Sequence, residues 1–302
     1  MRKAFQAAAA LAAVALVATG CAKPSSSSTP STGSGTTAAK FTGCMVTDTG
    51  GINDKSFNQA SWAGMQAAAA TSSNITVKYL PSTTTSDYAK NISTFIGQKC
   101  GIIVTVGFLM GPATEAAAKA NPKQKFAIVD CSYASACLTG THETNINQLV
   151  FNTVQDAFLG GYLAAGMTKT GKVATYGGEK FGTVTIYMDG FWDGVQYYNK
   201  QHHTHVQVLG WNEKTQSGSF TNSFTNLSAG QQITNTFITE GADVIFPVAG
   251  NVGLGSAKAV QQADGSGGHV DALTTGKARA LAADSHLQLP VDDVDRLGVL
   301  TV

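Results

Sequence analysis

The chain has 302 residues, of which 43% are hydrophobic and 13% are charged. This hydrophobic content is enough to build cores and excludes a wholly disordered chain. With 20 lysines and arginines against 19 aspartates and glutamates, the formal net charge is +1. That balance argues against a nucleic-acid binder and against a polybasic membrane-surface protein, because both need clustered positive charge. At roughly 150 residues per domain, the length predicts two lobes of similar size.

Residues 1–20 have the pattern of a signal peptide. Arg2 and Lys3 precede an apolar run over residues 7–18, which is too short to span a bilayer, and small residues follow it. Those small residues before Cys21 resemble a bacterial lipobox, in which the cysteine becomes the lipidated first residue of the mature protein. Ordinary cleavage nearby, with an incidental cysteine, is the alternative. Serine, threonine and glycine over residues 21–40 predict a flexible tether, so we expect lipid anchoring at the extracytoplasmic face of the cell membrane.

Short apolar runs and amphipathic stretches alternate from residue 41 onward. The apolar runs predict strands over residues 44–47, 75–80, 102–106 and 126–129. The stretches between them predict helices over residues 57–70, 88–98 and 112–120. This alternation predicts a parallel, doubly wound α/β sheet in a first lobe over residues 41–145.

A second series begins with a long helix predicted over residues 149–167. Strands follow over residues 172–176, 206–209 and 244–248, and helices over residues 184–198, 229–240 and 254–262. We therefore expect a second α/β lobe over residues 146–264. Ligands bind outside the carboxyl ends of the strands in such sheets, and two lobes joined by a hinge can close on a ligand. The organisation predicts an exported solute-binding protein.

The cysteines other than Cys21 predict two disulfides, because an even count is typical of an exported protein. Four cysteines allow three pairings. Cys131 and Cys137 flank a short loop, which favours a local bond. Cys44 and Cys100 each stand at the entrance of a predicted strand, and neighbouring parallel strands would bring them together. A zinc site is the alternative, but no Cys-x-x-Cys pair supports it.

The densest polar motif runs from Thr47 to Gln59, from the end of the first strand into a helix. Asp48 stands at the strand end, where its carboxylate can accept hydrogen bonds from the hydroxyl or N–H groups of a ligand. The carboxylate of Asp54 can cap the helix. Phe57 is either an ordinary core residue or a flat surface exposed for stacking, and the residues alone leave these interpretations even.

The segment over residues 46–64, VTDTGGINDKSFNQASWAG, strongly resembles the signature of the basic membrane protein family of lipoproteins. Further matches follow in order: AIVD at 127–130, DGFWDG at 189–194, FPVAG at 246–250 and GLG at 253–255. Members of this family are purine-nucleoside-binding receptors of ABC importers and have a type I periplasmic-binding-protein fold. The resemblance extends over about residues 41–264, most of the mature chain.

This resemblance implies that a purine base is sandwiched between two aromatic rings, one from each lobe, at positions that match Phe57 and Phe191. Stacking of a base on an aromatic ring is worth roughly 1–3 kcal/mol. Asp130 would pair with the N–H edge of the purine, and the bare backbone of Gly250 would let the ligand approach. The other ligand-binding residues that it implies in the first lobe are Asp48, Asn53, Asp54 and Asn58. We expect a lipoprotein that captures purine nucleosides and delivers them to ABC permease subunits, without a cofactor.

Two further patterns have a structural interpretation beside a functional one. The spacing Gly250-x-x-Gly253-x-Gly255 is not a dinucleotide fingerprint, and close packing of a helix on a strand is the alternative to a backbone contact with a ligand. The histidine cluster falls where a helix gives way to a strand, so a solvated turn is favoured over a metal site. Its members are His202, His203 and His205.

An enzyme is the rival class of function. The nucleophile elbow, the zincin motif and the P-loop are all absent from the sequence. Asp48 and Asp130 could in principle cleave nucleosides as a glycosidase-like pair, but the tether and the stacking rings favour capture over turnover. A type I binding protein for a sugar or an amino acid is the other rival, and it would have no evident need of two facing rings.

The family match fades after Asp264, and residues 265–302 lack a clean strand or helix rhythm. Residues 280–284 would supply a strand that ends in Asp284, matching a carboxylate that binds the ribose in this family. Residues 300–302 would begin the next segment, but the expected lysine does not follow. We therefore expect a truncated or frameshifted return segment, with weaker affinity and lower stability than a full-length relative.

Overall fold

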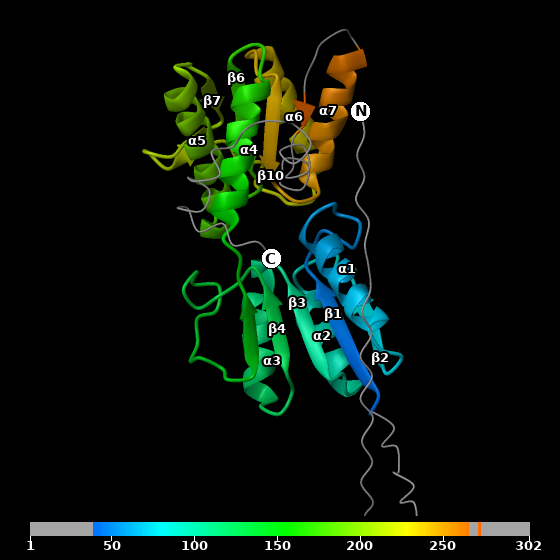
Figure 1. The fold of residues 1–302 in the computed structure, drawn as a ribbon. Coiled ribbons are helices and arrows are strands. Elements are labelled where there is room, and N and C mark those ends of the chain that lie inside the picture. The colour runs from blue at the N-terminus through cyan, green and yellow to red at the C-terminus, as the bar shows by residue number, and fades with distance from the viewer. Residues whose placement is uncertain (1–38, 266–270, 273–302) are drawn as a thin grey trace, which may run out of the picture. The chain divides into compact units, whose positions relative to one another are not determined.

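The computed structural model describes residues 39–265 and 271–272. The expected signal peptide, the lipidated Cys21, most of the tether and Asp284 lie outside these residues. The described part of the chain belongs to one compact unit that begins at Ala39. Its strands form two larger sheets, each of them parallel, with helices between most consecutive strands (Figure 1).

The first sheet has five parallel strands in the order β2-β1-β3-β4-β5. These are β1 (Phe41–Thr47), β2 (Ile75–Leu80), β3 (Ile102–Val106), β4 (Phe126–Val129) and β5 (Ile146–Leu149). The helices of this lobe are α1 (Phe57–Ala70), α2 (Asp87–Gly97), the short 3-10 helix η1 (Phe108–Met110) and α3 (Gly111–Ala120).

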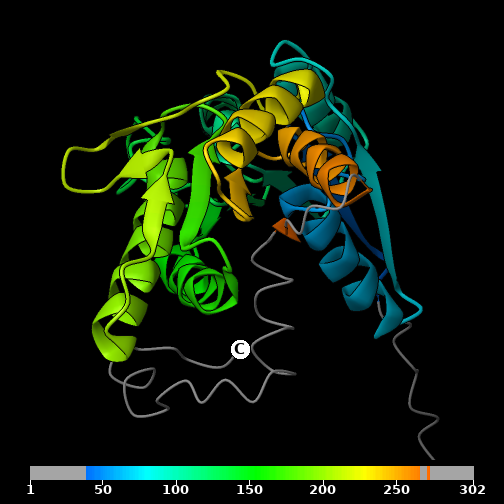
Figure 2. The same ribbon diagram turned by 90° about the horizontal axis from the view of Figure 1, so that it is seen from above.

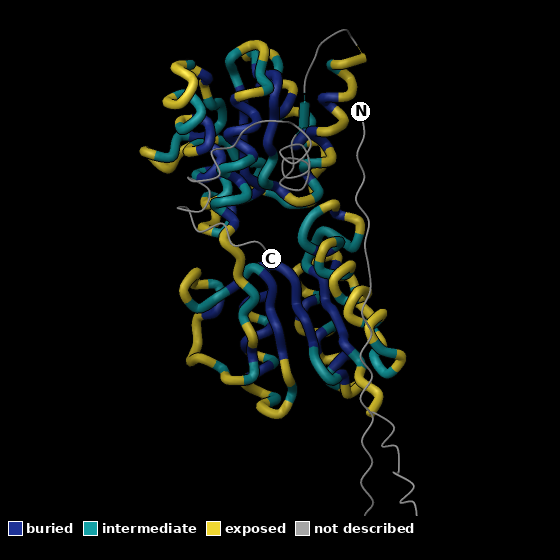
Figure 3. Tube along the Cα trace, in the orientation of Figure 1, coloured by how far each residue is buried: buried dark blue, intermediate teal, exposed yellow. Residues whose placement is uncertain are grey.

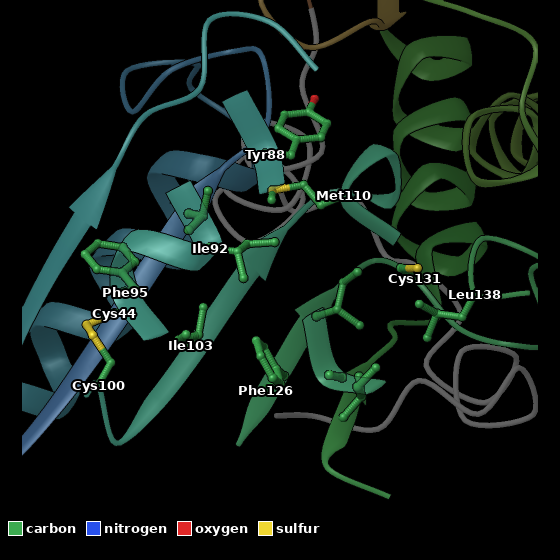
Figure 4. Packing of buried hydrophobic residues seen from close by; sticks show 14 residues of the cluster. Cys44, Tyr88, Ile92, Phe95, Cys100, Ile103, Met110, Phe126, Cys131 and Leu138 are labelled. Carbon is green, nitrogen blue, oxygen red and sulfur yellow. A yellow bond between two sulfur atoms is a disulfide. The ribbon is translucent and has the colours of Figure 1, made fainter. Parts of the chain in front are cut away.

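Alternating side chains divide the first lobe into two apolar layers. On one face of the sheet, Cys44 and Ile103 belong to the cluster that α2 and α3 complete (Figure 4). On the other face, Met45 and Val104 pack with Trp62 of α1. Because consecutive strand residues point to opposite faces, short and wholly apolar runs build both layers at once. Figure 3 shows the strands as the deeply buried part of the lobe.

The second sheet has four parallel strands in the order β11-β10-β6-β7. These are β6 (Lys172–Gly177), β7 (Gln207–Leu209), β10 (Val244–Val248) and β11 (Asp271–Ala272), while β8 (Trp211–Asn212) and β9 (Ser217–Gly218) form a small antiparallel pair. The helices are α4 (Thr153–Met167), α5 (Gly182–His202), α6 (Leu227–Thr239) and α7 (Val252–Gly265).

The second lobe also has two layers. Val173 and Phe246 pack with α4 and α5, whereas Ala174 and Ile245 pack with α6 and α7. Figures 1 and 2 show the two helix pairs on opposite sides of this sheet. The lobe therefore repeats the plan of the first, and most strands of both sheets lead from their carboxyl ends into loops that precede helices, with β4 and β7 as exceptions that lead into further strands.

Glycines bring the helices of each pair into backbone contact. A Cβ on Gly194 of α5 would lie 2.0 Å from the carbonyl oxygen of Phe158 in α4. A Cβ on Gly255 of α7 would lie 2.0 Å from the carbonyl oxygen of Leu227 in α6. No side chain fits at that distance. Gly255 thus serves the packing of two helices, where the sequence analysis expected packing on a strand or contact with a ligand.

The predicted α/β architecture with two parallel sheets is confirmed, and several predicted bounds agree with the structure to the residue. The clearest difference is β5, which was not predicted. It is an edge strand that pairs with β4 alone and contains Asn147 and Gln148, so no apolar run marks it. It extends the first sheet to Leu149, and α4 begins only at Thr153 instead of residue 149.

Both expected disulfides form. Cys44 in β1 is bonded to Cys100, and Cys131 is bonded to Cys137, so these sulfur atoms are not zinc ligands. In the described ranges, no group of His, Cys, Asp and Glu side chains has the arrangement of a metal site. None of the described helices combines the length and apolar character that a membrane crossing requires.

Candidate ligand-binding site

The site begins with Asp48, which directly follows β1. Its Oδ1 accepts a hydrogen bond of 2.8 Å from Nδ2 of Asn58, a buried residue on the first turn of α1. The other oxygen lies over the end of β3, because a Cβ on Gly107 would be 2.4 Å from Oδ2 of Asp48. Gly107 also has a φ of 101°, which favours glycine. The bare backbone at residue 107 therefore lets the Asp48 carboxyl reach across the neighbouring strand end.

Asp54 uses its carboxylate to begin α1. Oδ1 accepts the N–H groups of Ser56 and Gln59, and Oδ2 accepts that of Asn58. Helix starts leave such N–H groups without backbone partners, and a carboxylate there is favourable. The structure thus gives Asp54 the capping role that the sequence analysis considered. Asn53 is exposed, and its contact with a ligand stays a prediction.

Asp130 follows β4, two strands away from Asp48 in the same sheet. Its N–H donates to the carbonyl oxygen of Leu149, and the N–H of Gly107 donates to the carbonyl oxygen of Val129. The backbone of Asp130 is left-handed, with a φ of 61°. The neighbouring strands β1, β3 and β4 thus end in Asp48, Gly107 and Asp130, which lie side by side at the carboxyl ends of the sheet.

The carboxyl groups of Asp48 and Asp130 both have raised pKa values. Burial raises the pKa of Asp48 to about 6, against the opposing effect of the Asn58 hydrogen bond, and the charge of Asp54 adds to the increase. Burial, followed by the charge of Asp48, raises the pKa of Asp130 to about 7. Perturbed carboxyl groups are common at functional sites, because the surroundings that bind a ligand also disfavour an unpaired charge.

Phe57 is half-buried at the start of α1, and its ring meets that of Tyr187 edge-on, with 6.5 Å between the ring centroids. Tyr187 belongs to α5 in the second lobe. Burial raises the pKa of its hydroxyl, with the negative charge of Asp130 as the next cause. The contact therefore places a residue of the second lobe beside both Phe57 and Asp130.

The prediction for Phe191 is wrong. This residue lies in the middle of α5, is fully buried, and stacks on Phe246 of β10 at a centroid distance of 4.9 Å. Its neighbours Gly190 and Gly194 face the backbone of α4. The motif at residues 189–194 is therefore a helix-packing pattern, and the ring of Phe191 has no free face to offer a ligand.

Gly250 and Asn251 lie in the turn between β10 and α7. Gly250 is exposed and has a φ of 53°. Asn251 donates from Nδ2 to the carbonyl oxygen of Gly50 in the first lobe. The buried Oδ1 atoms of Asn251 and Asn58 have no hydrogen-bond partner among the described residues. Because buried polar atoms are nearly always paired, these two amide oxygens are candidate acceptors for a bound molecule.

Three residues of this region were missed by the sequence analysis. Tyr187 lies two residues before the motif at 189–194, and Asn251 directly follows the Gly250 that was singled out. Phe224 precedes α6, and its ring meets that of Phe108 at a centroid distance of 5.9 Å. A Cβ on Gly250 would lie 3.5 Å from the carbonyl oxygen of Phe224. No repeating pattern marks Phe224 and Asn251, which lie in loops, and Tyr187 lies in α5 without any motif of its own. For Tyr187 and Asn251, nearness to the matched motifs was the available signal.

The histidine cluster lies away from this region. His202 is the last residue of α5, and its Nε2 lies 3.0 Å from the hydroxyl of Tyr162. His203 caps the helix in a left-handed conformation. This placement at an exposed helix end agrees with the solvated turn that the sequence favours.

The family model described as "ABC transporter substrate-binding protein PnrA-like" (Bmp) matches residues 41–272. The ABC transporter nucleoside-binding protein BmpA of Lactococcus lactis subsp. cremoris is 31% identical over 249 residues, which cover 82% of this chain and 64% of that protein. The CD4+ T-cell-stimulating antigen of Listeria innocua is 33% identical over 235 residues, covering 76% of this chain and 60% of that protein. The chain thus spans about three fifths of the length of these relatives.

The solved structures give the same fold. A crystal structure of an ABC transporter system solute-binding protein from Aeropyrum pernix K1 superposes with a TM-score of 0.66 and 24% identity, covering 77% of this chain and 61% of that one. The likeness supports the type I periplasmic-binding-protein fold that the sequence resemblance implied. The matched family is one of substrate-binding proteins, not of enzymes. This chain belongs to the Bmp family of PnrA-like ABC transporter substrate-binding proteins.

Proposed function

We propose that the protein is the substrate-binding component of an ABC importer and that its ligand is a purine nucleoside. The family and the name of the Lactococcus relative support the transport role and nucleoside binding. The observation that carries the proposal is the meeting of Asp48, Asp130 and the ring of Phe57 at adjoining strand and helix ends. Lipid anchoring through Cys21 at the extracytoplasmic membrane face, with ABC permease subunits as partners, completes the proposal.

The base would stack on Phe57, which contributes flat apolar surface at little cost in side-chain entropy. A carboxylate suits the N–H edge of a purine because it accepts hydrogen bonds and cannot donate once ionised. Asp130 takes this edge in our proposal. Asp48, oriented by Asn58, accepts from a second donor of the ligand, and the bare backbone at Gly250 admits the ligand from the second lobe.

The second ring of the sandwich needs a new assignment, because Phe191 is in the core. A base held between two rings needs the flat face of each ring turned toward it. The Tyr187 ring meets Phe57 edge-on instead, so Tyr187 does not have the orientation for the second ring. Phe224 is the better candidate. It lies in the loop that precedes α6, and it is close to Gly250 and to the ring of Phe108. We assign the second stacking surface to Phe224.

Calorimetric titration with guanosine, adenosine and ribose tests the proposal. We expect Phe57→Ala to weaken nucleoside binding roughly 10- to 100-fold, in line with a stacking energy of about 1–3 kcal/mol. Phe224→Ala should weaken it similarly. Phe41→Ala is the matched control, because Phe41 is an exposed phenylalanine at the opposite end of β1.

Recovery of the ligand separates binding from catalysis. A receptor returns the nucleoside intact after incubation, whereas free base would support the glycosidase-like alternative. Binding of ribose alone with the affinity of a nucleoside would remove the purine from the proposal. Equal nucleoside affinity in wild type and Phe57→Ala would remove the stacking role of Phe57.

A further inference from the structure

The loop that follows Asp130 is closed by a disulfide that the proposed binding role does not use. Cys131 comes directly after Asp130 and is bonded to Cys137, six residues along the chain. Cys131 is fully buried and lies next to Leu138, whereas Cys137 is only partly buried (Figure 4). The crosslink therefore anchors one end of a surface loop in the core, immediately beside a candidate ligand group.

The residue before each of these two cysteines has a left-handed backbone. Asp130 has a φ of 61° and Ala136 has a φ of 59°. Residues with a Cβ rarely adopt this conformation, and alanine has no polar group that could offset its cost. Ser132 and Ser135 exchange hydrogen bonds inside the ring. The closed ring thus holds Ala136 in an unfavourable backbone conformation, and Asp130 has a left-handed one directly before the ring; an open loop would tend to relax both.

The same loop is fastened to α3. A Cβ on Gly111, the first residue of this helix, would lie 2.1 Å from the carbonyl oxygen of Cys137 and 3.2 Å from Sγ of Cys131. Glu115, one turn further on, accepts the backbone N–H groups of Thr139 and Gly140. The ring is therefore braced against a helix, and Asp130 is held at the junction between this braced ring and β4.

We infer that the Cys131–Cys137 disulfide is a positioning element for the ligand site, which holds the Asp130 carboxyl in place beside Asp48 and Tyr187. The inference rests on the proposed function for its effect on affinity, but the placement of the carboxyl is measurable without a ligand. Opening the ring lets Asp130 leave the left-handed region, and this turns the carboxyl away from its buried surroundings.

The other disulfide provides a matched control. Cys44 and Cys100 are both buried and are separated by 56 residues. Cys44 lies within β1, before Asp48, and its partner precedes β3, so this bond joins two strands at a distance from the strand ends that form the site. Its loss should lower the stability of the fold without moving the Asp130 carboxyl.

The test compares the full-length Cys131→Ala/Cys137→Ala and Cys44→Ala/Cys100→Ala variants. Titration of the Asp130 side-chain carbon by NMR, without ligand, should give a midpoint near 7 in the wild type and in the control, and a clearly lower midpoint in Cys131→Ala/Cys137→Ala. Guanosine affinity should fall at least tenfold in Cys131→Ala/Cys137→Ala and stay within about twofold in the folded control. An unchanged midpoint in Cys131→Ala/Cys137→Ala would overturn the inference, whether or not guanosine binds.

A double-mutant cycle with Asp130→Asn distinguishes positioning from general weakening. If the disulfide acts through Asp130, the loss of affinity caused by Asp130→Asn should shrink in the Cys131→Ala/Cys137→Ala background, whereas independent effects would multiply. If that background does not fold, wild-type protein reduced with dithiothreitol takes its place, with free thiols counted by mass after alkylation. Failure of the oxidised wild type to bind any nucleoside would sink the proposed function alone, because the NMR midpoint still decides the inference.

Discussion

Two carboxyl groups near one another set the chemistry of the site at the scale of single residues. Asp48 and Asp130 lie at strand ends, and the charge of Asp48 adds to burial in raising the pKa of Asp130. Such a pair is unfavourable in the empty protein and becomes favourable when a ligand brings N–H donors. Asp54, in contrast, is a carboxylate of the same motif whose two oxygens accept three N–H groups at the start of α1. Position in the backbone, not residue type, separates the two carboxyls that we propose bind the ligand from the one that caps α1.

Affinity should increase with pH. The empty site holds a proton up to a pKa of about 7 at Asp130, and a purine N–H favours the ionised carboxylate, so binding releases a proton. Below pH 7, affinity for the nucleoside should fall by up to about tenfold per pH unit. We expect binding at pH 5.5 to be roughly 30-fold weaker than at pH 8, because that pH lies about 1.5 units below the pKa of Asp130. Calorimetry in buffers of different ionisation enthalpy measures the released proton.

Asp130→Asn is the control for this pH dependence. The amide cannot lose a proton, so the variant should bind weakly at pH 8 and show a flatter profile. Equal wild-type affinity at both pH values, with heats that do not depend on the buffer, would contradict the assignment of Asp130 as the group that meets the ligand.

At the scale of elements, α5 shows what sequence patterns can and cannot reveal. The pattern at residues 189–194 correctly indicated a helix, because its spacing is periodic. It did not indicate which face the helix buries. Gly190 and Gly194 allow α5 to approach α4 so closely that Phe191, between them, is carried into the core. Tyr187 lies one turn before Phe191 on nearly the same face of α5, nearer the start of the helix, where its ring meets Phe57.

A pair of leucine variants separates the core ring from the stacking ring. Phe191→Leu should lower the free energy of unfolding by about 1–2 kcal/mol, because it loses the stack on Phe246 and some packing volume. Its nucleoside affinity should be unchanged. Phe57→Leu should keep most of its stability and lose affinity, since leucine has no flat face for a base. Denaturant unfolding and calorimetry measure the two quantities.

The opposite pattern would restore Phe191 to the site. If Phe191→Leu weakens nucleoside binding without lowering stability, α5 presents another face to the ligand than the structure indicates.

At the scale of the whole molecule, the sequence predicted the architecture better than the site. Buried parallel strands are marked by apolar runs, and β3, β4 and β10 were predicted to the residue for that reason. The strand β5 was not predicted, because Asn147 and Gln148 interrupt its apolar run at the edge of the sheet. Asp48 was predicted from its place at a strand end and Asp130 from the family resemblance, whereas Phe224 and Asn251 depend on loop conformations that carry no periodic signal.

Ligand binding should stabilise the folded protein as a whole. A ligand at 100 times its Kd adds about 2.7 kcal/mol to the free energy of unfolding, which corresponds to a rise in melting temperature of roughly 5–10 °C for a chain of this size. Guanosine should produce this rise at that concentration and ribose should not. Phe57→Ala should show a smaller rise at the same guanosine concentration. A melting temperature that does not change at millimolar nucleoside would count against the proposed ligand.

The glycine at the end of β3 has a consequence for how such a protein can diversify. Every single-base change of a glycine codon that replaces the residue introduces a side chain, and at position 107 that side chain would occupy the space of the Asp48 carboxyl. The left-handed backbone there disfavours the same replacements independently. A lineage that retains Asp48 in its present place must therefore retain this glycine, and new ligand preferences have to arise through substitutions elsewhere, with the loops of the second lobe as the open route.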